Sequence, residues 1–444
     1  MTPQLLEHTV APILAEVIKR QKQGKPRGIY AACTANAYAI RAVLRQAARD
    51  GTLALIESTA SQVNPTGGYT GLTPSRFRHQ VLQMAAEIGM PSNRVVLGGD
   101  HIGPHPWRHE DAERALQKAA GLAMACVAAG YRKIHLDTAT PCGNDPRQAD
   151  GSLPLELISR RSADLCRVAE QTARNAGIAP PWYVIGSDVP SPGGGDMAMG
   201  VAPVTDVQHI HDSVAACRRA FEAVGLADAW QRVLALVVYT GAEFSPVSVQ
   251  PYDTDRMQSL VAYIRQAKHL VLEAHSTDFQ TPTALARMVT DHVGILKVGP
   301  ALTYAMREAL FTLADIEKES LGGRKSIQCS DLPEVMERLM VADPGFWQSY
   351  YQGTEEEMAH LRRNAYSDRI RYYWACPAAD HAQRRLIDNL RQYPPPLSLI
   401  MGHLPEAGEK IHTGTLANDP ESIVLDRIAA VTAMYARACH PASS

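Results

Sequence analysis

Apolar residues gather in short runs along roughly the first three hundred positions, and longer segments with helical apolar spacing separate most of these runs. Short runs of this kind are typical of parallel strands that are buried on both faces, and the segments between them are typical of crossover helices. Eight runs fit this description, at 28–33, 53–57, 94–100, 133–137, 182–186, 233–238, 270–274 and 294–299. The clearest helical segments are 109–129, 162–176, 205–224 and 254–267.

Eight strand–helix units match a closed parallel barrel in number, whereas a doubly wound open sheet usually needs fewer strands. A barrel of this type takes about 250 residues, so a chain of 444 residues has room for a further segment. We therefore predict an α/β fold, with a (β/α)8 TIM-type barrel over residues 1–320 and a helical C-terminal extension over residues 321–444.

The predicted extension has helical segments at 332–341, 355–364, 381–390 and 422–438, with three consecutive prolines at 394–396 between them. We expect these helices to pack on the barrel or on a partner subunit. A separate catalytic domain is not expected there, because the polar residues of the extension form no compact constellation.

Composition and charge narrow the class of protein. The chain has 45% hydrophobic and 20% charged residues, as is usual for a globular protein, and its net charge of -2 gives no general reason to bind nucleic acid or an anionic membrane. Its eight cysteines form no C-x-x-C pair, which favours reduced thiols over a disulfide framework or a structural zinc site. Residues 1–20 do not resemble a signal peptide, so we expect a cytoplasmic protein.

Polar residues follow the predicted strands at the end where a β/α barrel assembles its chemistry. A single acidic residue in such a place is more often a helix cap or a turn former than a catalyst. Repetition on successive strands favours a site instead. The residues in question are Glu57, Asp100, His101, Asp137, Asp188, Glu243, Glu273 and His275.

The pair Asp100–His101 is the strongest candidate for catalysis, although a simple hydrogen-bonded turn is the alternative. An imidazole binds a divalent metal through one nitrogen, and a neighbouring carboxylate can transfer a proton without ligating the metal. We predict Asp100, Asp188 and Glu243 as catalytic residues, and we predict His101, His275, Asp137 and Glu273 as ligands of a divalent metal ion. Nitrogen and oxygen ligands admit Zn, Mn, Co or Ni and do not choose among them.

His135 shares one face of its strand with Asp137, because side chains alternate along a strand. We consider a hydrogen-bonded residue inside the barrel at least as good an interpretation of His135 as a metal ligand. The sequence also leaves open which of the carboxylates contact the metal.

Two loops are candidates for binding a phosphate group. The segment 64–71 contains Gly67 and Gly68, and a tight turn explains it equally well. The segment 297–303 contains Lys297 and Gly299, and it is favoured because phosphate sites of barrels often lie beside the last two strands. Ser276, next to His275, completes the predicted substrate- and phosphate-binding set.

Several of these segments resemble the family of Z-type subunits associated with class II D-tagatose-1,6-bisphosphate aldolase. The resemblance rests on 62–64 (QVN), 67–71 (GGYTG), 98–101 (GGDH), 134–137 (IHLD), 273–278 (EAHSTD), 296–302 (LKVGPAL) and 366–374 (YSDRIRYYW). It implies a β/α barrel and a role in D-tagatose phosphate metabolism. The family includes non-catalytic subunits that support an aldolase chain, and also D-tagatose 6-phosphate 4-epimerases.

Two segments depart from the pattern of the aldolase-supporting members. Asp188 stands where Glu is typical, and Tyr239–Thr240 stands where Gln–Pro is typical, but a carboxylate remains in both segments. We therefore favour a metal-dependent D-tagatose 6-phosphate 4-epimerase that binds a small sugar phosphate. The alternative is a Z-type subunit that partners a class II aldolase catalytic chain, and a homo-oligomer is compatible with both. A sugar kinase is least favoured, because no Walker-type loop is evident.

Overall fold

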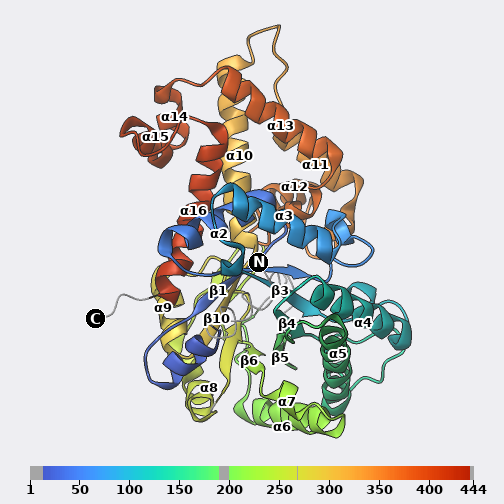
Figure 1. Ribbon diagram of the computed structural model, residues 1–444. Helices are drawn as coiled ribbons and strands as arrows, with labels where there is room; N and C mark the ends of the chain where they lie inside the picture. The colour runs from blue at the N-terminus through green and yellow to red at the C-terminus, as the bar shows by residue number, and fades with distance from the viewer. Residues whose placement is uncertain (1–13, 190–199, 268, 441–444) are drawn as a thin grey trace.

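A computed structural model of the chain describes residues 14–189, 200–267 and 269–440. Eight parallel strands form a closed barrel in the order β1-β10-β9-β6-β5-β4-β3-β2, and β1 pairs with β10 to complete it (Figure 1). The strands are β1 (Ile29–Cys33), β2 (Ala54–Thr59), β3 (Val95–Ile102), β4 (Lys133–Leu136), β5 (Trp182–Ile185), β6 (Val233–Val238), β9 (Val271–Ala274) and β10 (Val293–Val298). Each coincides with one of the eight predicted apolar runs, so the predicted TIM-type barrel is confirmed.

Helices follow the strands and surround the barrel. They are α2 (Ala37–Asp50), α3 (Pro74–Glu87), α4 (Ala112–Ala128), α5 (Leu155–Ala176), α6 (Val207–Ala223), α7 (Ala227–Trp230), α8 (Thr254–Gln266), α9 (Pro282–Thr290) and α10 (Pro300–Leu321). Local sequence sets several of their ends. The Asn36 side chain accepts hydrogen bonds from the amides of Tyr38 and Ala39 at the start of α2, and Gly51 ends that helix in the left-handed region with φ 67°.

Helix α5 begins at Leu155, seven residues before the predicted start at Ser162. A serine often caps a helix because its hydroxyl accepts from a free backbone amide. Here Ser162 is a buried residue in the interior of α5, and its hydroxyl lies 2.8 Å from the Thr138 hydroxyl. The Ser162 hydroxyl therefore bonds to Thr138, which follows β4, and does not cap the start of a helix.

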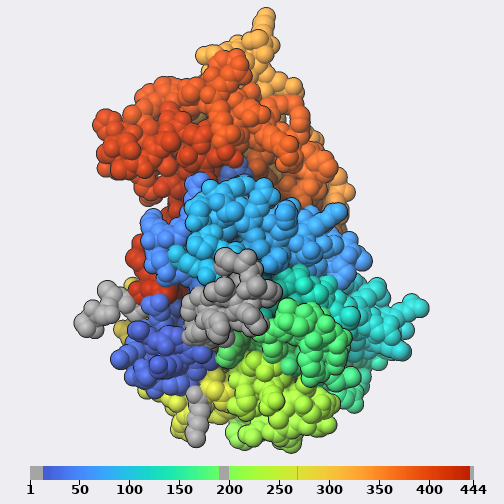
Figure 2. Space-filling view, viewed as in Figure 1, coloured from blue at the N-terminus to red at the C-terminus, as the bar shows by residue number. Residues whose placement is uncertain are grey.

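The C-terminal extension is helical, as predicted. It contains α11 (Leu332–Ala342), α12 (Glu355–Asn364), the 3-10 helix η5 (Arg369–Tyr373), α13 (Pro377–Gln392), α14 (Leu397–His403), α15 (Pro405–His412) and α16 (Pro420–Cys439). The short helices α14 and α15 were not predicted. In the space-filling view the extension, coloured orange to red, meets the blue segment that contains α2 and α3 (Figure 2).

The last helix, α16, returns from the extension and packs against α10, α2 and α9 of the barrel (Figure 1). The Tyr435 hydroxyl donates a hydrogen bond to the carbonyl oxygen of Thr277 at 2.7 Å, and the Gly28 amide donates to the Cys439 carbonyl at 3.0 Å. These bonds tie the end of the chain to the loop after β9 and to the start of β1. Among the described residues, no helix combines the length and the apolar character that crossing a membrane requires.

Candidate metal centre and substrate pocket

The inward-facing positions of the barrel change from apolar to charged along β2, β9 and β10. Side chains alternate along a strand, so residues two apart share a face. On β9 and its continuation, Val271, Glu273 and His275 follow one another on such a face, and all three are buried. Leu55 and Glu57 on β2 and Ile295 and Lys297 on β10 repeat the pattern, whereas β4 and its continuation place the polar Lys133, His135 and Asp137 on one face.

A layer of buried ion pairs forms the floor of the site. The Nζ atom of Lys133 lies 2.8 Å from Glu57 Oε1 and 2.7 Å from Glu273 Oε2, and none of these three side chains is exposed to solvent. The Nζ atom of Lys297 pairs with Glu57 and lies 2.9 Å from Asp100 Oδ2. Two ammonium groups thus link three carboxylates across the barrel, and each buried charge has an opposite charge beside it.

Above this layer, Asp100, His101, His135 and His275 converge. One ligand atom from each residue can be chosen so that all four atoms lie within 4.8 Å of one another, and all four residues are buried. His101 adopts a left-handed backbone with φ 48°, where the register between β3 and β4 shifts. This conformation lets two consecutive residues, Asp100 and His101, both face the cluster.

Two glycines permit this arrangement. A Cβ atom on Gly98 would lie 2.7 Å from Glu57 Cγ, and a Cβ atom on Gly103 would lie 1.6 Å from the Asp137 carbonyl oxygen. Both distances are too short for any side chain. The glycines of the segment 98–104 therefore make room for the carboxylate residues on both neighbouring strands.

Carboxylates stand behind two of the imidazoles. Nδ1 of His101 lies 2.7 Å from Asp137 Oδ2, and Nε2 of His275 lies 3.1 Å from Glu273 Oε1. His101 has its other nitrogen, Nε2, left for a ligand in the cluster, at 3.8 Å from Asp100 Oδ2. Nε2 of His275 lies 4.0 Å from Asp100 Oδ1, so on this ring the same nitrogen faces both Glu273 and the cluster. A carboxylate that bonds to one ring nitrogen fixes the tautomer and the orientation of an imidazole that binds a metal through the other.

Asp100 lies at the centre of these contacts. Its Oδ1 atom lies 3.1 Å from His135 Nδ1, and the Cys33 thiol donates to its Oδ2 atom at 3.1 Å. Burial raises the pKa of Asp100, but Lys297 and the imidazoles outweigh burial and hold this pKa well below its usual value. The carboxylate of Asp100 is therefore ionised at neutral pH.

The imidazoles respond differently to burial. Burial lowers the pKa of His275 to about 4, despite its hydrogen bond to Glu273. Burial also acts to lower the pKa of His101, but the carboxylates of Asp100 and Asp137 outweigh it and raise that pKa. A metal binds the neutral imidazole, which the lowered pKa of His275 favours and the raised pKa of His101 opposes.

The donor set fits a divalent transition metal. Three imidazoles and a carboxylate are ligands that zinc, manganese, cobalt and nickel accept. Nε2 of His135 is also buried without a hydrogen-bond partner among the described residues. A buried polar atom without a partner is costly unless a water molecule or an ion satisfies it.

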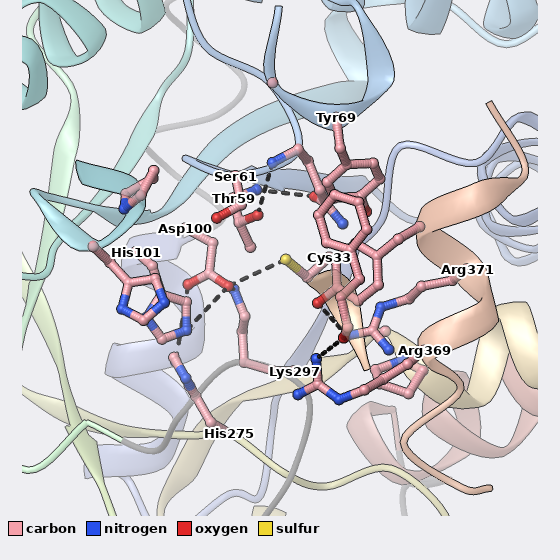
Figure 3. Close-up of a pocket in the computed structure, with 18 of the residues that line it drawn as sticks. Cys33, Thr59, Ser61, Tyr69, Asp100, His101, His275, Lys297, Arg369 and Arg371 are labelled. Carbon is pink, nitrogen blue, oxygen red and sulfur yellow. Dashed lines mark hydrogen bonds and ion pairs between the residues drawn. The ribbon is translucent and has the colours of Figure 1, made fainter. Parts of the chain in front are cut away.

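The cluster opens into a cavity of about 570 Å³ that barrel and extension residues line together (Figure 3). From the barrel come Cys33, Thr59, Gln62, Gly68, Asp100, His101, His275, Ser276, Lys297 and Gly299, and from the extension come Phe346, Tyr350, Arg369, Arg371 and Tyr372. Figure 3 shows the imidazoles and the arginines on opposite sides of the pocket.

The predicted site residues divide into three groups. Asp100, His101, His275, Ser276, Gly68, Lys297 and Gly299 line the cavity and Gly67 does not, whereas Asp137 and Glu273 bond to the rings of His101 and His275. Asp188 and Glu243 are not among the lining residues. Asp188 Oδ1 lies 3.2 Å from His209 Nε2, and the Glu243 carboxylate accepts from the Phe244 amide at 2.9 Å.

The backbone and ammonium groups of the predicted phosphate loops already have partners. Lys297 pairs with Asp100 and Glu57, and the Gly299 amide donates to Asp278 Oδ1 at 3.0 Å. The Gly68 amide donates to Asn64 Oδ1 at 3.1 Å, and the Gly67 amide donates to the Asn64 carbonyl at 2.9 Å. These groups stabilise the loops, and a bound anion would have to displace an existing partner from each of them.

Sequence reasoning did not select Arg369 or Arg371, which reach the pocket from η5. Both lie in the segment 366–374, which carried part of the family resemblance but followed no predicted barrel strand. The place of this segment in the family resemblance was the only signal that the sequence offered for these arginines. Because they lie far from the barrel strands in the sequence, strand-end reasoning did not place Arg369 and Arg371 in the pocket.

The fold and the site together define a TIM-barrel protein with a buried carboxylate–imidazole cluster at the carboxyl ends of its strands. The chain belongs to the GatZ/KbaZ-like family: the model of the family described as D-tagatose-1,6-bisphosphate aldolase subunit GatZ/KbaZ-like matches residues 14–440. The predicted family resemblance is thereby confirmed.

A solved structure of a similar protein agrees with the fold, and a more distant one is also similar to this chain. A probable tagatose 6 phosphate kinase from Sinorhizobium meliloti 1021 is 38% identical, with 93% of this chain and 100% of that chain covered and a TM-score of 0.84. A fructuronate-tagaturonate epimerase from Cohnella laeviribosi is 12% identical, with 93% and 81% covered and a TM-score of 0.48.

Proposed function

We propose that this chain is a metal-dependent D-tagatose 6-phosphate 4-epimerase. The observation that carries the proposal is the buried cluster of Asp100, His101, His135 and His275 beside an open cavity. A protein that served only to support a partner chain would not need buried ligands aimed at its own pocket. Buried titratable groups with strongly shifted pKa values in a cleft are typical of active sites.

In this proposal the three imidazoles would hold a divalent metal ion, and Asp137 and Glu273 orient His101 and His275 through their hydrogen bonds. The ion, when bound, would polarise the carbonyl group of a 2-ketose. Zn, Mn, Co and Ni remain the admissible ions. Asp137 and Glu273 are thus proposed as partners of the ligands, in place of the direct ligation that their strand-end positions indicated.

Asp100 is proposed to move the proton. Its ionised carboxylate takes the proton of the 4-hydroxyl group, the bond between carbons 3 and 4 breaks, and its electron pair passes into the enediolate of carbons 2 and 3. The aldehyde that forms at carbon 4 turns over, the bond forms again on its opposite face, and Asp100 returns the proton to the oxygen. Lys297 holds Asp100 in place through their 2.9 Å ion pair.

The second candidate is a subunit that supports a class II D-tagatose-1,6-bisphosphate aldolase. The description of the family, which names an aldolase subunit, favours it. A retained metal cluster is compatible with this role if it is structural. The relative from Sinorhizobium meliloti is described as a probable kinase. A kinase activity is less well supported for this chain, because its sequence has no evident Walker-type loop.

An assay with and without a partner separates the two candidates. The purified chain is incubated with D-tagatose 6-phosphate, and in parallel it is added to a class II tagatose-bisphosphate aldolase chain acting on the bisphosphate. We expect the chain alone to form D-fructose 6-phosphate and to leave aldolase turnover unchanged within about twofold. An increase in aldolase turnover without any interconversion would establish the subunit role in place of the epimerase.

A further inference from the structure

The extension places two arginines in the wall of the pocket. Arg369 is only 3% exposed, and its Nη1 atom donates to the Phe346 carbonyl at 2.8 Å. Its Nε and Nη2 atoms are buried and have no hydrogen-bond partner within the described parts of the chain. A guanidinium with unsatisfied buried donors is costly, and an anionic ligand would satisfy them.

Among the described residues, no acidic side chain forms a close ion pair with either arginine, and Asp278 in the pocket lining and Asp368 act on Arg371 only from a longer distance. Within the described residues, neither guanidinium has a carboxylate oxygen within 4.0 Å. The acidic neighbour in sequence, Asp368, is already engaged with Arg307 Nε at 2.9 Å and with the Thr303 hydroxyl at 2.6 Å. The positive charge of Arg369 and Arg371 is therefore left for something that enters the cavity.

The positive charge of Arg369 and Arg371 affects the hydroxyl group of Tyr372. It accepts a hydrogen bond from Arg371 Nη2 at 2.9 Å. Burial raises the pKa of Tyr372, but the positive charges of Arg371 and Arg369 outweigh burial and lower this pKa. An anion is favoured at the same place for the same electrostatic reason.

Packing holds both guanidinium groups in position. The Cζ atom of Arg369 lies 3.0 Å from the centroid of the Tyr350 ring, and that of Arg371 lies 4.5 Å from the Tyr372 ring. The bonds of Asp368 to α10 fix the start of η5, and Arg371 Nη1 donates to the Asp368 carbonyl at 3.1 Å. The two side chains therefore need little reorganisation to bind a ligand.

We propose that Arg369 and Arg371 bind the phosphate group of the substrate, a ketose carrying a terminal phosphate monoester. Planar guanidinium groups recognise phosphate through paired hydrogen bonds. The cluster of Asp100 and the imidazoles lies across the pocket, where the carbonyl end of the sugar would bind (Figure 3). The identity of the sugar rests on the proposed function, whereas the anion site rests on the arginines alone.

Equilibrium binding tests this inference without any need for turnover. Titration calorimetry on the full chain compares D-fructose 6-phosphate, D-fructose and inorganic phosphate. We expect Arg369→Gln to weaken binding of D-fructose 6-phosphate and of inorganic phosphate about tenfold or more, and to leave the affinity for D-fructose unchanged. Arg371→Gln, which removes a less buried guanidinium, is expected to act in the same direction and serves if Arg369→Gln does not fold.

The matched control is Arg363→Gln, because Arg363 stacks on Phe311 and is exposed outside the cavity. It should bind all three ligands as the unaltered chain does. Equal affinity of the unaltered chain and both pocket variants for D-fructose 6-phosphate would overturn the inference. If the chain lacked epimerase activity but lost phosphate binding in these variants, the anion site would stand and the proposed function would fall.

Discussion

Exhaustive chelation of divalent metal is expected to lower the interconversion of D-tagatose 6-phosphate and D-fructose 6-phosphate to the background rate. Carbon–carbon bond cleavage next to a carbonyl requires stabilisation of the negative charge that develops on its oxygen, and in the proposed mechanism a bound cation would stabilise this charge. Return of about one equivalent of Zn, Mn, Co or Ni should restore turnover with at least one of these ions. Activity and metal content are measured on the same samples.

A pair of variants tests whether the metal that turnover requires is bound by the cluster of Asp100 and the three imidazoles. His275→Ala removes an imidazole whose partner Glu273 remains, so we expect it to bind less than about a tenth of the metal that the unaltered chain binds. His403→Ala removes an imidazole that lies outside the pocket on α14 and bonds to Glu319, and it should retain full metal content. Full turnover in metal-free protein would refute a metal-dependent mechanism.

Asp100→Asn is expected to lower turnover by about a hundredfold or more, because the amide cannot accept the proton of the 4-hydroxyl group. The side chain keeps its size, so the barrel should fold as before. In our assignment Asp100 transfers a proton and does not ligate the metal, so the variant should still bind about one equivalent. Turnover is followed by quantifying D-fructose 6-phosphate, and metal content is measured in parallel.

Two outcomes would change the assignment of Asp100. A variant that lost its metal together with its activity would make Asp100 a ligand. A fully active variant would move the base to Asp137, Asp188, Glu243 or Glu273. Of these, Asp137 is nearest to the cluster, since it is bonded to His101 at 2.7 Å.

The barrel was predictable from sequence because each strand is a compact apolar run, and the barrel closes only when all eight runs pair. Strand-end polarity also located Asp100, His101 and His275, since neighbouring parallel strands place their carboxyl ends at one rim. The short helices α14 and α15 escaped prediction because they contain 7 and 8 residues, too few for a clear apolar period.

The roles within the site were harder to predict, because they depend on partners distant in sequence. Lys297 was a candidate for phosphate, but its ammonium pairs with Glu57, 240 positions away. The amide of Gly299 was another candidate, but it bonds to Asp278. Spacing along one strand shows which face a residue occupies, whereas the choice between ligand and supporting carboxylate depends on contacts across the barrel.

The two pocket arginines of the extension were also hard to predict from the sequence. Arg369 and Arg371 reach the pocket only because Asp368 attaches η5 to α10, through Thr303 and Arg307. Nothing in the local sequence of 366–374 indicates a barrel rim. A pattern of strands and helices predicts where the barrel's own residues lie, but not which distant segment covers the mouth of the pocket.

The most direct test of the proposed epimerase follows carbon 4 itself. Purified chain loaded with a divalent metal, with no other protein present, is incubated with D-tagatose 6-phosphate in deuterium oxide, and the products are examined by NMR. We expect D-fructose 6-phosphate that keeps its original hydrogen at carbon 4, because the bond between carbons 3 and 4 breaks while the carbon–hydrogen bond does not. Deuterium at carbon 4 would contradict the cleavage route, and the absence of any D-fructose 6-phosphate would contradict the epimerase.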